Sequence, residues 1–332
     1  MIKVSILVPI CNVEKYLSQC LSSLACQTLK ELEIICINDG SSDKSLEIIK
    51  KFRNQDNKII LIDKPNSGYG DSMNKGLQIA KGEYVGIVES DDFVEPDMFE
   101  VLYKIASNTK CDIVRGLYWL YWDEKGDKRT RFFNDIYGKV FNPLENKKIF
   151  LEAPAIWSAI YKRSFLNEHD ISFLPTPGAS YQDTSFFFKT LLMAQKMYVV
   201  PEFLLHYRQD NMGSSVKQVS LSKASLIHRE IEEINVFLQK KQHMFNDIQS
   251  VINSREINIC LWNLKRISIK DSIIYKDRVK KFLEPIMDNE KYENQLLSNI
   301  DKILFFLIKI NNNFLLKLFL LLYKKGKLFY HE

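Results

Sequence analysis

The stretch Tyr84-Val85-Gly86-Ile87-Val88-Glu89-Ser90-Asp91-Asp92 changes character at Glu89. Its first half is an apolar run typical of a buried strand, and its second half holds three carboxylates within four residues. Because like charges repel and are costly to bury unpaired, this cluster must be solvated or hold a cation. Hard cations such as Mg²⁺ bind carboxylates together with substrate phosphates. The stretch therefore predicts either a polar turn before a helix or a metal site at a strand end.

The residues before this stretch alternate between strand and helix patterns. Four apolar runs predict strands at Lys3–Val8, Leu32–Ile37, Lys58–Ile62 and Tyr84–Val88. The segments between them carry apolar residues at helical spacing, the first from Glu14 to Gln27. Strands that alternate with helices form parallel βαβ units, whose ligands bind beyond the carboxyl ends of the strands. Polar or turn-forming residues follow each predicted strand, so we expect them to line one crevice suited to a nucleotide.

The composition is that of a soluble globular protein, with 46% apolar and 26% charged residues. Its six cysteines form no C-x-x-C pair, which predicts a reducing, cytoplasmic compartment without disulfides. The N-terminus lacks the pattern of a signal peptide. No G-x-G-x-x-G follows the first strand, which disfavours a dinucleotide oxidoreductase. Residues 221–332 are helical in periodicity and basic, with 19 Lys and Arg against 13 Asp and Glu.

Several motifs occur in a recognisable order. They are Val4-Ser5-Ile6-Leu7-Val8-Pro9 with Asn12, Asn38-Asp39-Gly40-Ser41-Ser42-Asp43, Asn66-Ser67-Gly68, Asn74-Lys75-Gly76 and Glu89-Ser90-Asp91-Asp92. Together they resemble the inverting, metal-dependent glycosyltransferases of family 2, which have the α/β GT-A fold. The resemblance implies a catalytic domain at 1–218, with a nucleotide-sugar half at 1–100 and an acceptor half at 101–218. A mainly helical C-terminal region would occupy 219–332.

The resemblance also implies a set of site residues. Nucleotide-sugar contacts are expected from Pro9, Asn12, Glu14, Asp39, Asn66, Gly68, Asn74, Glu89, Ser90 and Asp91. Asp91 and Asp92 are expected to hold Mn²⁺ or Mg²⁺ against the diphosphate. Asp183, at the start of a predicted helix whose positive end favours the ionised carboxylate, is the expected general base. Diphosphate or acceptor contacts are considered for His206, Arg208 and Trp157.

The implied reaction moves a hexose or N-acetylhexosamine from a UDP-sugar to a hydroxyl of a bacterial surface glycan. The acceptor would be a glycan or lipid-linked glycan of a capsule, lipooligosaccharide or exopolysaccharide, and no nucleic acid is expected to bind. Cys11, Met73 and Gln182 depart from the family pattern, so a non-catalytic nucleotide-sugar-binding protein stays an alternative. A sugar nucleotidyltransferase is a further alternative, disfavoured because the first loop lacks Gly and Arg.

The apolar stretches Ile303–Ile308 and Phe314–Tyr323 lie near the C-terminus and are followed by Lys324 and Lys325. Neither stretch approaches the ~20 apolar residues that span a bilayer. A basic, apolar-faced segment of this kind can lie at an anionic membrane surface on the inner face of the cytoplasmic membrane. It can equally pack on the catalytic domain or on a second subunit of a homodimer. The sequence leaves these alternatives open.

Overall fold

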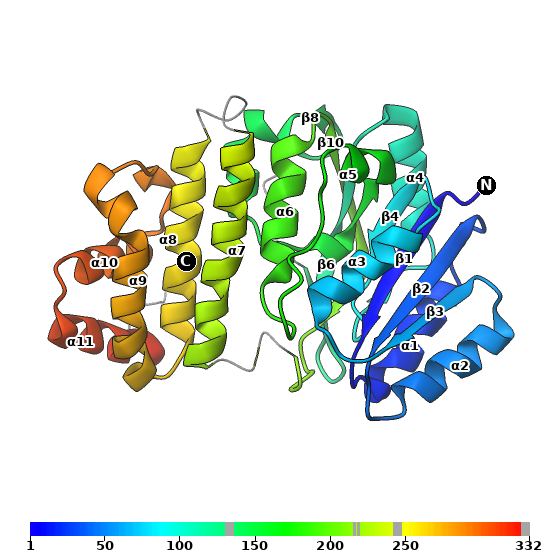
Figure 1. Ribbon diagram of the computed structural model, residues 1–332, viewed down its shortest axis with the longest axis horizontal. Coiled ribbons are helices and arrows are strands. Elements are labelled where there is room, and N and C mark those ends of the chain that lie inside the picture. Colours follow the sequence, from blue (N-terminus) through cyan, green and yellow to red (C-terminus); the bar gives the residue numbers. More distant parts are fainter. Residues whose placement is uncertain (130–135, 215–216, 218–219, 242–247, 327–332) are drawn as a thin grey trace. The chain divides into compact units, whose positions relative to one another are not determined.

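The computed structural model describes residues 1–129, 136–214, 217, 220–241 and 248–326 (Figure 1). The chain forms two compact units. The first holds Met1–Glu145 and Pro154–Met212, and the second holds Asn146–Ala153 and Gly213–Glu332. Sequence patterns had suggested a division at residue 218, whereas the second unit also takes a short segment from the middle of the chain.

A mixed sheet forms the centre of the first unit, with the strand order β3-β2-β1-β4-β9-β6-β10-β5. The strands are β1 (Val4–Ile10), β2 (Leu32–Asp39), β3 (Ile59–Lys64), β4 (Tyr84–Ile87), β5 (Phe93–Val94), β6 (Ile113–Trp122), β7 (Gly126–Arg129), β8 (Val140–Phe141), β9 (Ala159–Lys162) and β10 (Met197–Arg208). The first four strands are parallel, as the sequence predicted. β9 runs antiparallel between β4 and β6. Every residue of β1 and β2 is buried, which is why both read as continuous apolar runs.

The first strand continues past the residue that was expected to end it. Pro9 lies in register with Ile37 of β2, and β1 ends at Ile10. Val88 donates to the carbonyl of Leu7 on the β4 side of the strand, at 3.0 Å. The backbone nitrogen of Pro9, two residues after Leu7, faces the same side of the strand, where the pairing with β4 has ended. Its missing N–H therefore breaks no ladder hydrogen bond, and the strand tolerates the proline.

The remaining elements of the first unit are helical. They are α1 (Glu14–Ala25), α2 (Ser45–Gln55), α3 (Tyr69–Ile79), α4 (Met98–Thr109), α5 (Arg163–Glu168) and α6 (Gln182–Met193), with short 3₁₀ turns at Pro143–Glu145 and Ile156–Ser158. α1 packs beside α2, while α3 packs on β1 and β2. The starts of α1, α2 and α3 therefore gather where β1, β2 and β3 end.

The second unit is helical in its described residues. It comprises α7 (Leu221–Lys240), α8 (Gln249–Arg266), α9 (Ile269–Asn289), α10 (Asn299–Lys309) and α11 (Asn313–Lys324), with 3₁₀ turns at Lys147–Leu151 and Asn294–Leu296. α8 is buried along most of its length against its neighbours. Among the described residues, no helix has both the length and the apolar character to cross a membrane.

Candidate active site

The loops that follow β1 and β2 are tied to each other. The Oδ1 atom of Asn12 accepts a hydrogen bond from the backbone of Ser42 at 2.8 Å. Glu14 Oε2 accepts one from the backbone of Lys44, also at 2.8 Å. Asn12 has a φ of 52°, in the left-handed region that Asn adopts more readily than most residues. Asn12 and Glu14, which were predicted to contact the nucleotide-sugar, thus link the two loops that form this rim of the crevice.

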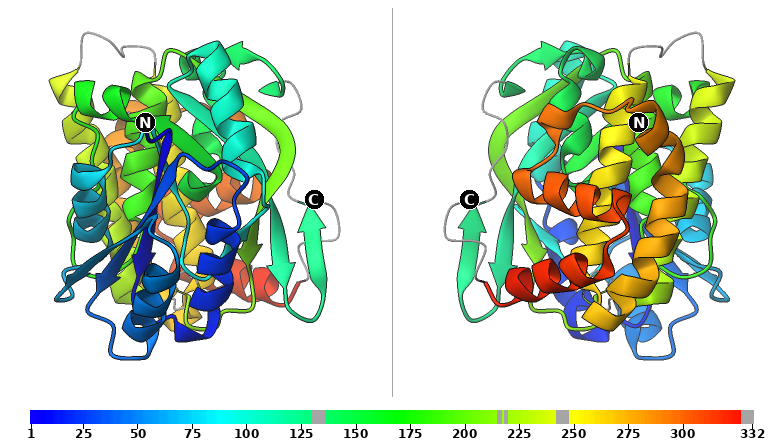
Figure 2. Two further views of the ribbon diagram at one scale, coloured as in Figure 1. Left: turned by 90° about the vertical axis from the view of Figure 1, so that its right-hand side faces the viewer. Right: turned by 90° about the vertical axis from the view of Figure 1, so that its left-hand side faces the viewer.

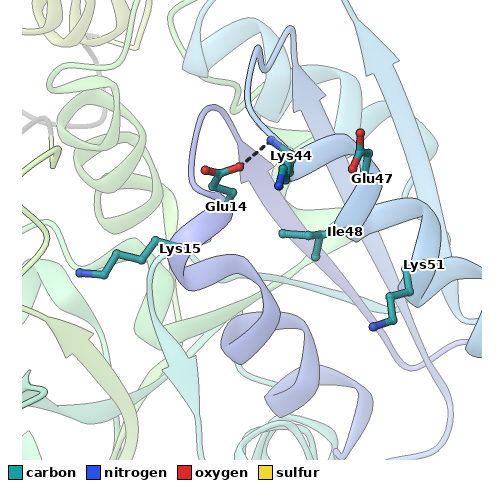
Figure 3. A pocket seen from close by; sticks show the side chains of 6 residues that line it. All are labelled: Glu14, Lys15, Lys44, Glu47, Ile48 and Lys51. Atoms are coloured by element: carbon teal, nitrogen blue, oxygen red, sulfur yellow. Dashed lines mark hydrogen bonds between the residues drawn. The ribbon is translucent and has the colours of Figure 1, made fainter.

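A shallow depression lies beside this rim, with a volume of about 550 Å³ (Figure 3). It is lined by Glu14, Lys15, Lys44, Glu47, Ile48 and Lys51. Figure 3 shows Glu14 directed at the backbone of Lys44, whereas Lys15 points away from both. Of the predicted site residues, this depression includes Glu14, and the acidic stretch lies outside its lining.

Asp39 organises the loop that follows β3. Its buried carboxylate accepts hydrogen bonds from the backbone of Ser67 at 2.8 Å and of Gly68 at 3.0 Å, and it pairs with Lys64. The side chain of Asn66 donates back to the carbonyl of Asp39 at 2.9 Å. Any contact between Asp39 and a nucleotide would share oxygens that already carry these bonds, and that contact stays a prediction.

The acidic stretch lies directly after β4, and its carboxylates have different surroundings. Tyr69 donates to Glu89 Oε1 at 2.7 Å. Burial raises the pKa of Glu89 to about 8, with the charges of Asp91 and Asp183 adding to the rise. Ser90 is buried beside it. Glu89 is thus mostly protonated at neutral pH.

Asp92 is 1% exposed, and its Oδ1 accepts a hydrogen bond from the backbone of Arg208 at 2.8 Å. Its Oδ2 has no hydrogen-bond partner among the described residues. Burial, with repulsion from Asp91, raises the pKa of Asp92 well above its usual range. Asp91 is less buried, and its Oδ2 accepts a hydrogen bond from Asn211 at 2.8 Å.

Asp183 lies in the first turn of α6. Burial raises the pKa of Glu89, Tyr69 and Tyr207, and the charge of Asp183 adds to each rise, so its carboxylate lies within electrostatic range of all three side chains. The fold therefore brings Asp183 to the acidic stretch, although the two are far apart in the sequence. Tyr69 and Tyr207 were not predicted as part of this cluster, and the position of Tyr69 directly after Gly68 was the signal available.

The loop before α6 explains one departure from the family pattern. Gln182 is buried, and its Oε1 accepts a hydrogen bond from the backbone of Ser180 at 2.6 Å. Its Nε2 donates to Thr176 Oγ1 at 2.9 Å and to the carbonyl of Gly178 at 3.3 Å. A glutamate at this position could accept but could not donate. Gln182 thus holds the loop that leads into Asp183.

The first turn of α3 lies against the same loop. The backbone N–H of Tyr69 donates to the carbonyl of Gly178 at 2.9 Å. A Cβ at Gly70 would lie 2.0 Å from the carbonyl oxygen of Leu174, so this close approach requires a glycine. Asn74 exchanges two hydrogen bonds, each of 2.9 Å, with the backbone of Phe173. The segment that carries Asp183 is therefore anchored on α3.

The buried guanidinium of Arg208 is surrounded by protein groups. Its Nε donates to the carbonyl of Asp91 at 2.9 Å, and Nη1 donates to Asp123 at 2.6 Å. Its Cζ also lies 4.6 Å from the ring centroid of Tyr16. Since the backbone of Arg208 holds Asp92 as well, this residue positions the acidic stretch. Its predicted diphosphate contact stays a prediction.

His206 and Trp157 also make extensive contacts with the protein. The two ring nitrogens of His206 lie 3.0 Å from Asp127 and 2.9 Å from Glu95, and the ring stacks on Phe93. Trp157 packs against Tyr118 and Tyr207, with ring centroids 4.6 and 4.8 Å apart. The contacts of these two side chains with a diphosphate or an acceptor stay predictions.

The carboxylates of the acidic stretch provide part of what a metal site requires. Within the described residues, no three His, Cys, Asp or Glu side chains form a ready-made metal cluster. The unpartnered, buried Oδ2 of Asp92 and the nearby carboxylate of Asp91 offer two hard oxygen donors. Mg²⁺ and similar ions are commonly held by one or two carboxylates together with substrate phosphates and water. The donor set therefore fits a divalent cation that arrives with a diphosphate.

Comparison with known proteins identifies the family. Residues 5–169 match the family described as Glycosyl transferase family 2. Glycosyltransferase GlyG of Streptococcus pneumoniae serotype 4 is 30% identical over 245 residues, which cover 70% of this chain and 77% of GlyG. The chain belongs to glycosyltransferase family 2. The predicted family and the enzyme class are thus confirmed.

A longer relative and a solved structure extend the comparison. Glycosyltransferase GlyA of the same bacterium is 27% identical over 292 residues, or 83% of this chain, but the match spans only 40% of GlyA. The crystal structure of S. aureus TarS 1–349 in complex with UDP-GlcNAc superposes with a TM-score of 0.61. It covers 98% of this chain and 92% of TarS 1–349, at 19% identity. The predicted GT-A fold with a helical C-terminal region is confirmed.

Proposed function

We propose that this chain transfers a hexose or N-acetylhexosamine from a UDP-sugar to a hydroxyl group of a bacterial surface glycan, with inversion at the anomeric carbon. The observation that carries the proposal is the convergence of Asp183 with Glu89-Ser90-Asp91-Asp92 in a chain of this family. A UDP-sugar donor is supported by the UDP-GlcNAc bound in the TarS structure. A glycosyl transfer reaction of a bacterial type is supported by GlyA and GlyG, both from Streptococcus pneumoniae. The free thiols of all six cysteines fit a reducing, cytoplasmic compartment.

On the donor side, the proposal assigns the nucleotide to the crevice formed by the loops after β1, β2, β3 and β4. Asp91 is the more accessible of the two adjacent aspartates, so we assign it as the direct metal ligand. Asp92, whose Oδ1 is fixed by the backbone of Arg208, supports Asp91 from the buried side of the acidic stretch. A divalent cation bound there would neutralise the charge that develops on the leaving diphosphate.

On the acceptor side, Asp183 is proposed to take the proton of the acceptor hydroxyl while the hydroxyl oxygen attacks the anomeric carbon. The N-terminus of α6 favours the ionised form of this carboxylate. Glu89 also lies in the cluster, but burial keeps it mostly protonated at neutral pH, which makes it a poor base. The two carboxyl groups therefore have different proposed roles, with Glu89 facing the nucleotide.

Two isosteric substitutions test these roles. Asp183→Asn should lower transfer by about 10²–10⁴-fold, the usual contribution of a general base, and leave Mn²⁺-dependent UDP binding intact. Asp91→Asn should weaken that binding, measured by calorimetric titration. Asp97→Asn, an exposed aspartate at the start of α4, is the matched control. Unchanged turnover in Asp183→Asn would remove the base assignment. A wild-type chain that bound UDP-sugars without turning over any of a donor panel would favour the non-catalytic alternative.

A further inference from the structure

The two last helices of the second unit expose a group of large apolar side chains. Six positions between residues 303 and 318 are 40% to 74% exposed: Ile303, Phe306, Ile310, Phe314, Leu315 and Leu318. Ile303 and Phe306 on α10, and Ile310 directly after its last residue, follow one another at spacings of three and four residues, so they share one face of the helix. Isolated exposed apolar residues are ordinary, but a concentration of this size marks an interaction surface.

This exposed face is held in place by the rest of the unit. Leu304 and Ile308 of α10, and Leu316 and Leu320 of α11, are fully buried on the opposite sides of the two helices. The buried amine of Lys276 bonds to Asn311, and to Asn313 at 2.7 Å, and so fixes the connection between the helices. The right-hand view of Figure 2 shows α10 and α11 facing the viewer, with no other ribbon of the unit in front. Buried contacts therefore fix one side of the two helices, and the exposed side chains lie on the other side.

The charge on these two helices is almost all positive. Residues 299–326 contain five lysines, at positions 302, 309, 317, 324 and 325, and one acid, Asp301. Asp301 is buried and paired with Lys265 at 2.8 Å, so it does not offset the lysines at the surface. Lys317 lies among the exposed apolar residues of α11, and Lys325 follows the last turn of that helix.

We propose that this α10–α11 face, the six exposed apolar residues together with Lys317 and Lys325, binds the surface of an anionic lipid membrane. Helices of 11 and 12 residues are too short to span a bilayer but can lie in its interface. There, apolar side chains enter the acyl boundary while lysines meet anionic headgroups. This inference does not depend on the proposed sugar-transfer reaction.

The charge pattern favours a membrane over a second copy of the chain. A two-fold symmetric dimer brings the same patch of each subunit together, so the lysines of one copy would face those of the other. The cores of protein interfaces are also depleted in lysine. An anionic membrane, in contrast, gains from each of these lysines.

Flotation of the full chain with lipid vesicles tests the proposal. The chain should float with vesicles of phosphatidylcholine and phosphatidylglycerol at low salt, and much less with phosphatidylcholine alone or at high salt. Phe306→Gln with Phe314→Gln should lower partitioning by more than about ten-fold. Lys317→Gln with Lys325→Gln should lower it by about 25-fold, because each lysine near an anionic surface contributes about five-fold. Val236→Gln, which changes an exposed apolar residue of α7, is the matched control and should float like the wild type.

Three results would overturn the proposal. One is a wild-type chain that stays unbound at low salt, and another is a phenylalanine variant that floats like the wild type. The third is a wild-type dimer, seen by sedimentation velocity, that the phenylalanine substitutions dissociate without any vesicle binding. That last result would assign the face to a second copy. Release of UDP in the absence of vesicles reports the proposed reaction separately, so failure of either proposal can be recognised.

Discussion

The side chain of Asn74 bridges α3 to the segment that precedes α6. Its Nδ2 donates to the carbonyl of Phe173 and its Oδ1 accepts from the N–H of the same residue, both at 2.9 Å. Phe173 is 1% exposed, so neither backbone group can turn to water instead. Asn74→Ala would therefore leave a buried donor and a buried acceptor without partners.

The size of the effect follows from these two groups. An unsatisfied buried polar group costs about 1–3 kcal/mol, so we expect Asn74→Ala to lower the free energy of unfolding by about 2–6 kcal/mol. Turnover should fall as well, because the segment leading to Asp183 loses an anchor, while UDP affinity stays close to that of the wild type. Asn108→Ala, at an exposed position of α4, is the control and should change stability by less than about 0.5 kcal/mol.

Urea unfolding, followed by circular dichroism and tryptophan fluorescence, measures the stability change, and calorimetric titration with UDP measures binding. The reasoning fails if Asn74→Ala unfolds like the wild type but binds UDP more weakly. Asn74 would then act on the nucleotide itself, which is the role implied by the resemblance to family 2.

Two further predictions concern other parts of the chain. Gly70→Ala places a Cβ 2.0 Å from the carbonyl oxygen of Leu174. The substitution should therefore lower the free energy of unfolding, measured with urea, by more than about 1 kcal/mol and should also slow transfer. Wild-type values for both quantities would contradict the close approach. Burial raises the pKa of Glu256 from 4.5 to about 7, so the native state binds more protons than the unfolded state between these values. Stability should therefore fall by up to about 3 kcal/mol as pH rises through this window, and Glu256→Gln should flatten the dependence in urea titrations at successive pH values. An equal slope in the variant would exclude Glu256 as the cause.

Features that depend on neighbouring residues were predicted well. The four parallel strands follow from apolar runs bounded by turn residues, and the acidic stretch after β4 follows from its own composition. The end of β1 was placed too early, at Val8, because a proline such as Pro9 is tolerated where one side of a strand has lost its partner. That fact depends on the length of β4, which no pattern within β1 can indicate.

Features that depend on distant residues could not be predicted. The antiparallel insertion of β9 between β4 and β6 joins segments with no local pairing signal. The nucleotide contact of Asp39 stays a prediction, but its role in organising the loop after β3 was not predicted. Arg208 was considered as a diphosphate contact because of the family resemblance, and that contact stays a prediction. Its ion pair with Asp123 was not predicted, because the pairing of β10 with β6 brings the two residues together. In each case the tertiary fold decides which group a polar side chain meets.

The hydrogen bond from the backbone of Arg208 to Asp92 joins residues 116 positions apart. During synthesis at about 5–20 residues per second, the acidic stretch would leave the ribosome about 6–23 s before its partner strand. The parallel strands β1 to β4 can pair during this interval, but the carboxylate of Asp92 stays unanchored until β10 joins the sheet. A chain that stops before residue 208 would therefore carry every donor-side motif and still lack the hydrogen bond that anchors Asp92. The anchoring of Asp92 is therefore possible only after β10, the last strand of the first unit, has been synthesised.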